Sequence, residues 1–205
     1  MGQLRFTHAG GKLGLTFDEP SHEYRLDGKV IPSVSQIVDE AGCWGDKSFF
    51  KSKEPAIKGS RIHRCLELYD KQTLDWNSIK GSNYQPYIDA WSAFLFDHQA
   101  KIVLNEDKHH MTMEGVTFAG TIDRILEIDG KVHVVDIKTG KSYPKPYGVQ
   151  TTAYGCLAED LLGYEVESVF CLHFKERRGK LEYEVKEKDR AKWMPVWIQA
   201  LKDRK

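Results

Sequence analysis

The sequence predicts a mixed α/β fold in which helices flank a central sheet. Apolar residues recur at helical spacing in several segments, and they alternate with polar residues at strand spacing in a long central stretch. In chain order the segments are two long helices, three strands, a helix, two strands and a final helix, an order typical of a sheet covered by helices. The 205 residues are expected to form a single domain, because this length is usual for one domain.

Composition favours a soluble, folded chain. Hydrophobic residues make up 40% of the sequence and charged residues 29%, which disfavours disorder and coiled coil. The 30 basic and 30 acidic residues cancel, so no overall charge attracts the chain to nucleic acid or to a membrane. Apolar runs stay far below the roughly 20 residues of a membrane span, and the first residues do not resemble a signal peptide. We therefore expect a cytoplasmic protein that does not contact a membrane.

The N-terminal part is expected to form a hairpin and a short helix. Residues 23–31 alternate in polarity about an Asp27-Gly28 turn, which is a hairpin signal. Ser33 is a typical N-cap, and it predicts a helix over 34–41.

Two amphipathic helices are expected next, over 54–70 and 83–99, because each carries an apolar stripe at helical spacing. The period then changes to two over residues 101–138, which predicts a three-stranded meander.

The C-terminal part returns to the helical period over 146–162, and Gly163 is expected to end that helix. Strands are expected over 166–174 and 181–185, followed by a helix over 189–202.

The informative turn is Asp129-Gly130, which is a strong signal for a two-residue hairpin turn. That turn fixes the strand register and predicts that Asp123 lies directly opposite Asp136. Lys138 is expected on the same face as Asp136, because side chains alternate along a strand.

A divalent cation would relieve the repulsion between these two acids. Mg²⁺ and similar ions prefer carboxylate and carbonyl oxygens. The backbone carbonyl of Ile137 lies between the side chains of Asp136 and Lys138. The alternative is a solvated strand end with ordinary charges. Apolar residues on both faces of the hairpin favour covered faces and hence a functional role for the charges. These residues are Ile122, Ile125, Val134, Val135 and Ile137.

Glu106 is a conditional third acid. If Glu114-Gly115 is also a two-residue turn, Glu106 comes opposite Asp123, whereas a bulge near Gly120 would turn it away.

Asp123, followed by Asp136-Ile-Lys138 within GTIDR and VVDIKTG, resembles the catalytic core of the PD-(D/E)XK nuclease superfamily. The similarity is to its RecB-like branch, which includes phage exonucleases and the mitochondrial genome maintenance exonuclease. Three further segments match that branch: HEYRLDGKVIPSVS (22–35), GSRIH (59–63) and QTTAY (150–154). The superfamily's proline is absent, since Ile122 precedes Asp123.

The resemblance implies a restriction-endonuclease-like mixed sheet flanked by helices. It divides the chain into an N-terminal hairpin and helix (1–50), a catalytic core (51–186) and a C-terminal helix (187–205). It implies one or two Mg²⁺ or Mn²⁺ ions held by His63, Asp123, Asp136 and the Ile137 carbonyl. Because no cysteine follows Cys171, we expect no iron–sulfur cluster of the kind found in some members.

The resemblance also assigns roles in hydrolysis. Asp123, Asp136 and Lys138 would be catalytic, with Lys138 holding or deprotonating the attacking water. Gln150 and Tyr154 lie one helical turn apart, so they share a face and would line the same site. The plainer interpretation makes them a capping glutamine and a core tyrosine.

The expected function is that of a metal-dependent deoxyribonuclease, an exonuclease of phage or prophage recombination or repair. Its expected partners are single-stranded DNA or duplex ends and a single-strand annealing or recombination protein, in a bacterial or phage-infected cell. The alternatives are a catalytically silent binding or assembly module, a restriction-type enzyme and a structure-specific endonuclease.

Contacts to DNA phosphates are expected from Lys58, Arg61, Lys141 and Lys145, although such lysines and arginines also serve solubility. Aromatic side chains near the start of the core are expected to stack on unpaired bases or to pack in the core. They are Trp44, Phe49 and Phe50.

Overall fold

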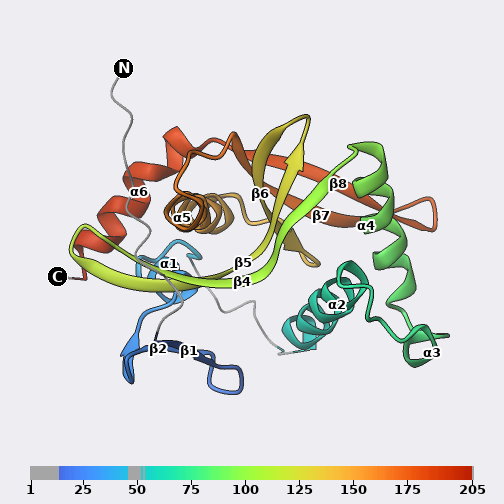
Figure 1. The fold of residues 1–205 in the computed structure, drawn as a ribbon, viewed down its shortest axis with the longest axis horizontal. Coiled ribbons are helices and arrows are strands. Elements are labelled where there is room, and N and C mark those ends of the chain that lie inside the picture. Colours follow the sequence, from blue (N-terminus) through green and yellow to red (C-terminus); the bar gives the residue numbers. More distant parts are fainter. Residues whose placement is uncertain (1–13, 46–51, 53, 205) are drawn as a thin grey trace.

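The computed structural model describes residues 14–45, 52 and 54–204, and a five-stranded sheet forms its centre (Figure 1). The strands of this sheet lie in the order β4–β5–β6–β7–β8, and all neighbours are antiparallel except β6 and β7. A smaller sheet has the order β1–β2–β3. The bounds of the strands are Leu15–Asp18 (β1), Glu23–Leu26 (β2), Lys29–Ile31 (β3), Lys101–Met113 (β4), Val116–Ile128 (β5), Lys131–Lys138 (β6), Ser168–Arg177 (β7) and Lys180–Lys188 (β8).

Helices cover both faces of the central sheet, as Figure 1 shows. On one face, α1, α5 and α6 pack against β5 and β6, and on the other α2, α3 and α4 pack against β5 to β7. Helix α5 is the crossover between the parallel strands β6 and β7. The bounds of the helices are Val34–Glu40 (α1), Glu54–Asp70 (α2), Trp76–Ile79 (α3), Gln85–Asp97 (α4), Pro144–Leu162 (α5) and Arg190–Lys202 (α6). The predicted mixed α/β fold is confirmed.

The two-residue turn at Asp129-Gly130 sets the register of the β5–β6 hairpin. Both residues have positive φ, 52° and 74°, as a type I′ turn requires. Ile128 therefore pairs with Lys131, and the predicted register continues along the strands. This hairpin carries the predicted acids toward the end of the sheet.

Helix α1 is fixed to the central sheet at its first residue. The Ser33 hydroxyl accepts a hydrogen bond from the N–H of Gln36, and the Gln36 side chain accepts one from the N–H of Ser33. This capping box confirms the predicted N-cap. The N–H of Ala119 on β5 also donates to the carbonyl of Pro32, which ties the start of α1 to the sheet.

Gly120 allows the helices to approach β5 closely. A Cβ atom at this position would lie 2.9 Å from the ring of Tyr154 and 3.0 Å from Leu157, both on α5. It would also lie 3.2 Å from Val34 on α1. A larger residue at Gly120 would push α5, and with it Tyr154, away from the sheet.

Short elements and element ends differ from the predictions. Strand β1 and the four-residue helix α3 were absent from the prediction, because segments this short carry too few residues to show a period. Helix α5 begins at 144 rather than 146, since proline is well tolerated in the first helical turn. Helix α4 is shorter than predicted, and β7 and β8 extend beyond their predicted ends. Within the described part of the chain, no helix is both long and apolar enough to cross a lipid bilayer.

Candidate active site

The end of the β5–β6 hairpin forms the floor of the candidate site. The ladder of paired residues ends at Arg124 and Val135, one pair short of the predicted pairing of Asp123 with Asp136. The reason is that the N–H of Ile137 donates to Oδ2 of Asp123 at 2.7 Å, so a carboxylate takes the place of a ladder carbonyl. Asp123 and Asp136 are nevertheless both buried at this end of the hairpin, with 8% and 2% of their surface exposed.

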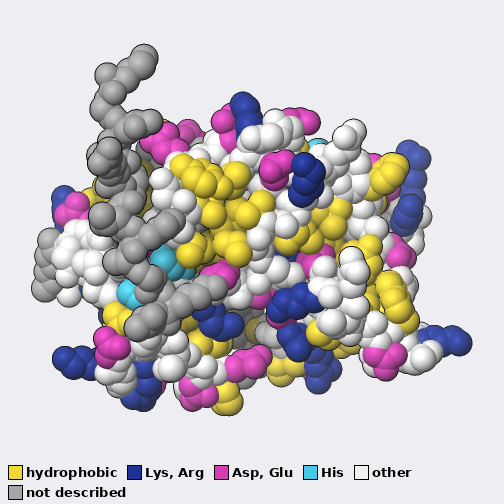
Figure 2. All heavy atoms as spheres, in the orientation of Figure 1, with side chains coloured by type: hydrophobic (Ala, Val, Ile, Leu, Met, Phe, Trp, Pro, Cys, Tyr) yellow, Lys and Arg dark blue, Asp and Glu magenta, His cyan; other side chains and the backbone are white. Residues whose placement is uncertain are grey.

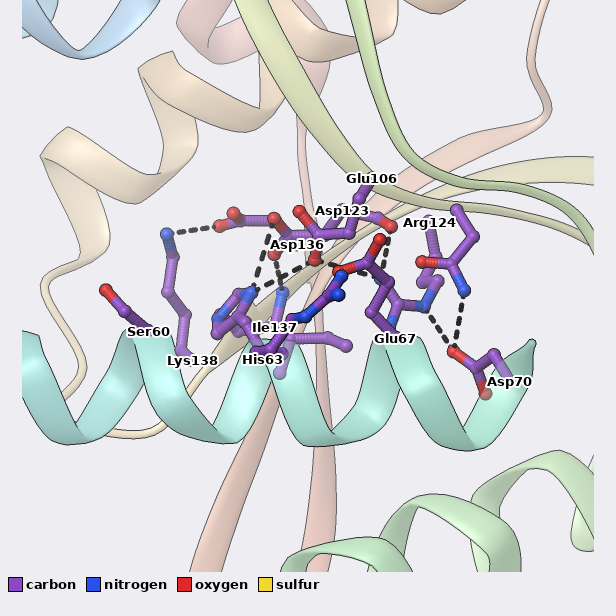
Figure 3. A network of polar contacts seen from close by, with 12 residues as sticks. Ser60, His63, Glu67, Asp70, Glu106, Asp123, Arg124, Asp136, Ile137 and Lys138 are labelled. Atoms are coloured by element: carbon purple, nitrogen blue, oxygen red, sulfur yellow. Dashed lines mark hydrogen bonds and ion pairs between the residues drawn. The ribbon is translucent and has the colours of Figure 1, made fainter. Parts of the chain in front are cut away.

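Three side chains from three different elements converge beside Asp123 (Figure 3). One ligand atom each from His63 on α2, Glu106 on β4 and Asp123 on β5 lies within 4.8 Å of the others. Nδ1 of His63 is 3.5 Å from Oε1 of Glu106 and 3.5 Å from Oδ1 of Asp123. Carboxylate oxygens and an imidazole nitrogen are a donor set that suits a divalent metal ion.

The conditional register for Glu106 is confirmed. Met113 pairs with Val116 across the Glu114-Gly115 turn, and the pairing stays regular through Gly120. The β4 residues on either side of Glu106 pair in the register that sets it opposite Asp123. Glu106 itself has a positive φ of 50°, a value that residues other than glycine rarely adopt.

His63 also reaches the neighbouring strand β6. Its Nε2 lies 3.0 Å from the carbonyl oxygen of Ile137. Helix α2 comes this close because residue 59 is glycine, whose hypothetical Cβ would lie only 3.1 Å from Oγ1 of Thr139. The predicted neighbourhood of His63, Asp123 and Ile137 is therefore present. Metal binding by His63, Asp123, Asp136 and the Ile137 carbonyl stays a prediction.

A chain of polar contacts holds Lys138 on the side of α5. Its Nζ lies 2.7 Å from Oδ2 of Asp136 and donates to Oε1 of Gln150 at 3.0 Å. Nε2 of Gln150 donates to the Tyr154 hydroxyl at 3.0 Å and to Oγ of Ser35 at 3.3 Å. The structure thus brings Gln150 and Tyr154 to Lys138, and it adds Ser35 from α1.

Burial and charge shift the pKa values of these groups. Burial raises the pKa of Asp123 and of Asp136, and the charges of His63 and Lys138 oppose that rise. Burial lowers the pKa of Lys138, but Asp136 and Asp123 outweigh it, so the pKa lies above its ordinary value. For His63 burial again lowers the pKa, while Asp123 and Glu106 raise it to about 9. Buried acids of this kind are stabilised by added positive charge, so the donor set fits a bound cation.

A buried arginine, Arg124, supports this site, and no pattern in the sequence indicated it. Nε of Arg124 donates to Oδ2 of Asp70 at 2.7 Å, and its Nη1 donates to Oε1 of Glu106 at 3.1 Å and to the carbonyl of Asp123 at 2.5 Å. The centre of the Trp91 ring lies 5.7 Å from Cζ of Arg124, and Nε1 of Trp91 donates to Asp70. Arg124 is fully buried and holds Glu106 beside Asp123 (Figure 3). In the sequence, only the adjacent Asp123 marks Arg124 as part of the site. The buried partner of Arg124, Asp70, is 54 residues away, so the sequence does not reveal their contact.

The four basic residues predicted to contact DNA are all exposed. Lys58 and Arg61 lie on α2, where they line a surface pocket of about 400 Å³, and Lys58 Nζ lies 5.3 Å from the centre of the Tyr87 ring. Lys141 and Lys145 follow β6 in the loop and first turn of α5. Figure 2 shows basic and acidic side chains interspersed on the visible face, which agrees with the balanced charge of the chain. Phe49 and Phe50 lie outside the described residues.

Comparison with known proteins identifies a family. The family model described as the PD-(D/E)XK nuclease superfamily matches residues 46–204. Two solved structures to which the chain shows some similarity are of an alkaline exonuclease, LHK-Exo, from Laribacter hongkongensis. The first has 12% identity and a TM-score of 0.42, covering 85% of this chain and 87% of that one. The second, in complex with dAMP, has 11% identity and a TM-score of 0.35, covering 84% and 87%. A search of curated protein sequences found no match.

Proposed function

Because the chain belongs to the PD-(D/E)XK nuclease superfamily, we propose that it is a metal-dependent deoxyribonuclease that hydrolyses DNA from its ends. The observation that carries this proposal is the convergence of His63, Glu106 and Asp123 beside the buried pair of Asp136 and Lys138. The segments HEYRLDGKVIPSVS (22–35) and QTTAY (150–154) support the RecB-like, phage-type branch. A single-strand annealing or recombination protein is the proposed partner.

A divalent ion, Mg²⁺ or Mn²⁺, would be held by His63, Glu106 and Asp123, with Asp136 and the Ile137 carbonyl as further ligands. Such an ion stabilises negative charge on a phosphoryl group and lowers the pKa of a bound water. Arg124 keeps the Glu106 carboxylate oriented toward Asp123, because it bonds both Glu106 and the Asp123 backbone.

Lys138 would supply a positive charge beside the metal ion. Before a cation binds, the neighbouring acids keep the pKa of Lys138 above its ordinary value, so its ammonium group is protonated and donates hydrogen bonds. At the scissile phosphate it would stabilise charge that develops in the transition state and would orient the attacking water.

Gln150 orients Lys138. Its Oε1 accepts from Nζ, and its amide is held in turn by Tyr154 and Ser35. This arrangement leaves the ammonium fixed before substrate binds, which avoids reorganisation during the reaction.

Phosphates farther along the strand would contact Lys58 and Arg61 on one side and Lys141 and Lys145 on the other. With a net charge of zero, the chain lacks a general attraction for long duplex DNA. This favours a short contact at an end over capture along the duplex.

The test offers end-labelled linear DNA and closed circular DNA, each single- and double-stranded, with Mg²⁺ or Mn²⁺. We expect loss of the linear forms, survival of the circles and no cleavage by Asp123→Asn. Preferential loss of the circles would overturn the exonuclease assignment. An absence of cleavage with both metals on all four substrates would overturn the nuclease assignment and favour the silent binding module.

A further inference from the structure

We propose that Trp44, Tyr143 and Tyr147 form a stacking subsite for an unpaired base of the DNA strand whose phosphate lies at Lys138. This inference rests on the proposed function, because the nuclease assignment places the substrate phosphate at Lys138. It adds the substrate class: a strand that is single-stranded next to the scissile bond.

The three aromatic rings form one cluster. The ring centre of Trp44 lies 5.4 Å from that of Tyr143 and 5.7 Å from that of Tyr147, and the two tyrosine rings are 5.7 Å apart. All three contacts are edge-to-face, so they fix the orientation of the rings without stacking them in parallel. Trp44 and Tyr143 are half-buried and Tyr147 is buried. Fixed rings that are partly open to solvent can stack on a base at little cost in side-chain entropy.

The cluster directly contacts the proposed catalytic lysine. Nζ of Lys138 lies 4.5 Å from the centre of the Tyr147 ring, a cation–π contact, and the same Nζ lies 2.7 Å from Asp136. The Tyr147 hydroxyl donates to the carbonyl of Lys141 at 3.1 Å, which holds the loop after β6 against the cluster. A strand with its phosphate at Lys138 would therefore have a base within reach of Tyr143 and Trp44.

Basic side chains border the same cluster. Lys141 and Lys145 are exposed in the segment that carries Tyr143 and Tyr147. Lys145 also lies near Cys43, the residue before Trp44. Burial raises the pKa of the Cys43 thiol, and the charge of the Lys145 ammonium acts in the opposite direction. Basic side chains beside aromatic rings are the usual combination for binding single-stranded nucleic acid.

Helix capping does not explain the residue at position 143. Tyr143 is the N-cap of α5, a position where serine, threonine, aspartate or asparagine is strongly preferred. Its side chain makes no capping hydrogen bond. Trp44 also packs against the core beside α1 and α5, and part of its surface stays exposed.

The test measures binding in EDTA, where no divalent metal is available for cleavage. Fluorescein-labelled oligothymidylate and a labelled duplex are titrated with the full chain and with Trp44→Ala, Tyr143→Ala and Trp44→Phe. Each alanine variant should bind the single strand about 5- to 140-fold more weakly, since a stacked base contributes ~1–3 kcal/mol and 1.4 kcal/mol is tenfold. Duplex binding should change less than about twofold, and Trp44→Phe should retain most of the affinity because it keeps a ring.

Trp76→Ala is the matched control, because Trp76 is half exposed and also makes an edge-to-face contact, with Tyr69. It should bind both probes as the wild type does. Circular dichroism and urea unfolding establish which variants fold. If Trp44→Ala does not fold, Tyr143→Ala alone tests the subsite. Wild-type affinity of the folded alanine variants for the single strand, or equal losses on both probes, would overturn the subsite.

A kinetic measurement separates this inference from the proposed function. If the wild type cleaves single strands, Tyr143→Ala should raise KM and leave kcat within about twofold, because the ring binds substrate and transition state alike. If the wild type cleaves no DNA but the ring-dependent binding is found, the nuclease assignment fails and the stacking site stands.

Discussion

The backbone N–H of Ile137 donates a 2.7 Å hydrogen bond to Oδ2 of Asp123, and this bond ends the ladder between β5 and β6. The other oxygen of the same carboxylate, Oδ1, lies 3.5 Å from Nδ1 of His63. Oδ2 of Asp123 is thus held by the backbone of β6, while Oδ1 faces His63 on α2. This division positions Asp123 as a ligand before any ion binds.

Asp123→Ala should remove most of the metal affinity of the chain. We expect Mn²⁺ binding, measured by calorimetric titration, to weaken at least about tenfold, since even groups that only support a ligand typically contribute 10–100-fold. Glu106→Gln should also weaken binding, because Glu106 lies in the same group of donors. Asp97→Asn, at an exposed residue bonded to Tyr183, is the control and should bind as the wild type does. Equal affinity in Asp123→Ala and wild type would exclude this metal site.

Lys138→Ala should abolish cleavage while DNA affinity stays nearly unchanged. The ammonium is placed to act on charge that appears in the transition state, and one lysine contributes little to a phosphate footprint. Single-turnover rates and binding curves measure the two effects separately. The exposed Lys101→Ala is the control, since Lys101 pairs only at the surface with Glu127. A rate that falls less than about tenfold, roughly 1.4 kcal/mol of barrier, would mean that Lys138 is not the catalytic lysine.

Asp70→Ala should destabilise the fold strongly. The substitution leaves the guanidinium of Arg124 buried without its main partner, and such losses cost about 3–5 kcal/mol of unfolding free energy. Urea unfolding measures this value. Removal of the exposed partner in Lys101→Ala should cost less than about 1 kcal/mol. A loss in Asp70→Ala as small as in this control would show that Arg124 is satisfied by other groups.

His173 should make the fold sensitive to acid. Burial, together with Lys186 and Lys188, lowers the pKa of its imidazole from 6.5 to about 4. The unfolded chain therefore binds a proton that the folded chain rejects, and stability is lost as the pH falls from the unfolded pKa toward the folded one. Urea unfolding at about pH 7.5 and about pH 5 should show a smaller loss in His173→Gln than in the wild type. Identical losses in the two proteins would assign the acid sensitivity to other groups.

Local sequence determined the strands and the turn that bring the acids together. The Asp129-Gly130 turn sets the register within a hairpin of two adjacent segments, so Asp123 and Asp136 can be placed without knowledge of the rest of the fold. The helical spacing of Gln150 and Tyr154 placed them on one face for the same reason.

Long-range packing decided the remainder of the site. His63 and Ile137 are 74 residues apart, and their contact depends on how closely α2 approaches the sheet. The same holds for Arg124 and Asp70, and for Ser35 and Gln150, which are 115 residues apart.

The protonation of Lys138 shows this dependence most clearly. The sequence places two acids and a lysine together, but burial and the acids shift the pKa of the lysine in opposite directions. Which effect is larger depends on distances between side chains, such as the 2.7 Å from Nζ to Asp136, and only the tertiary structure sets them.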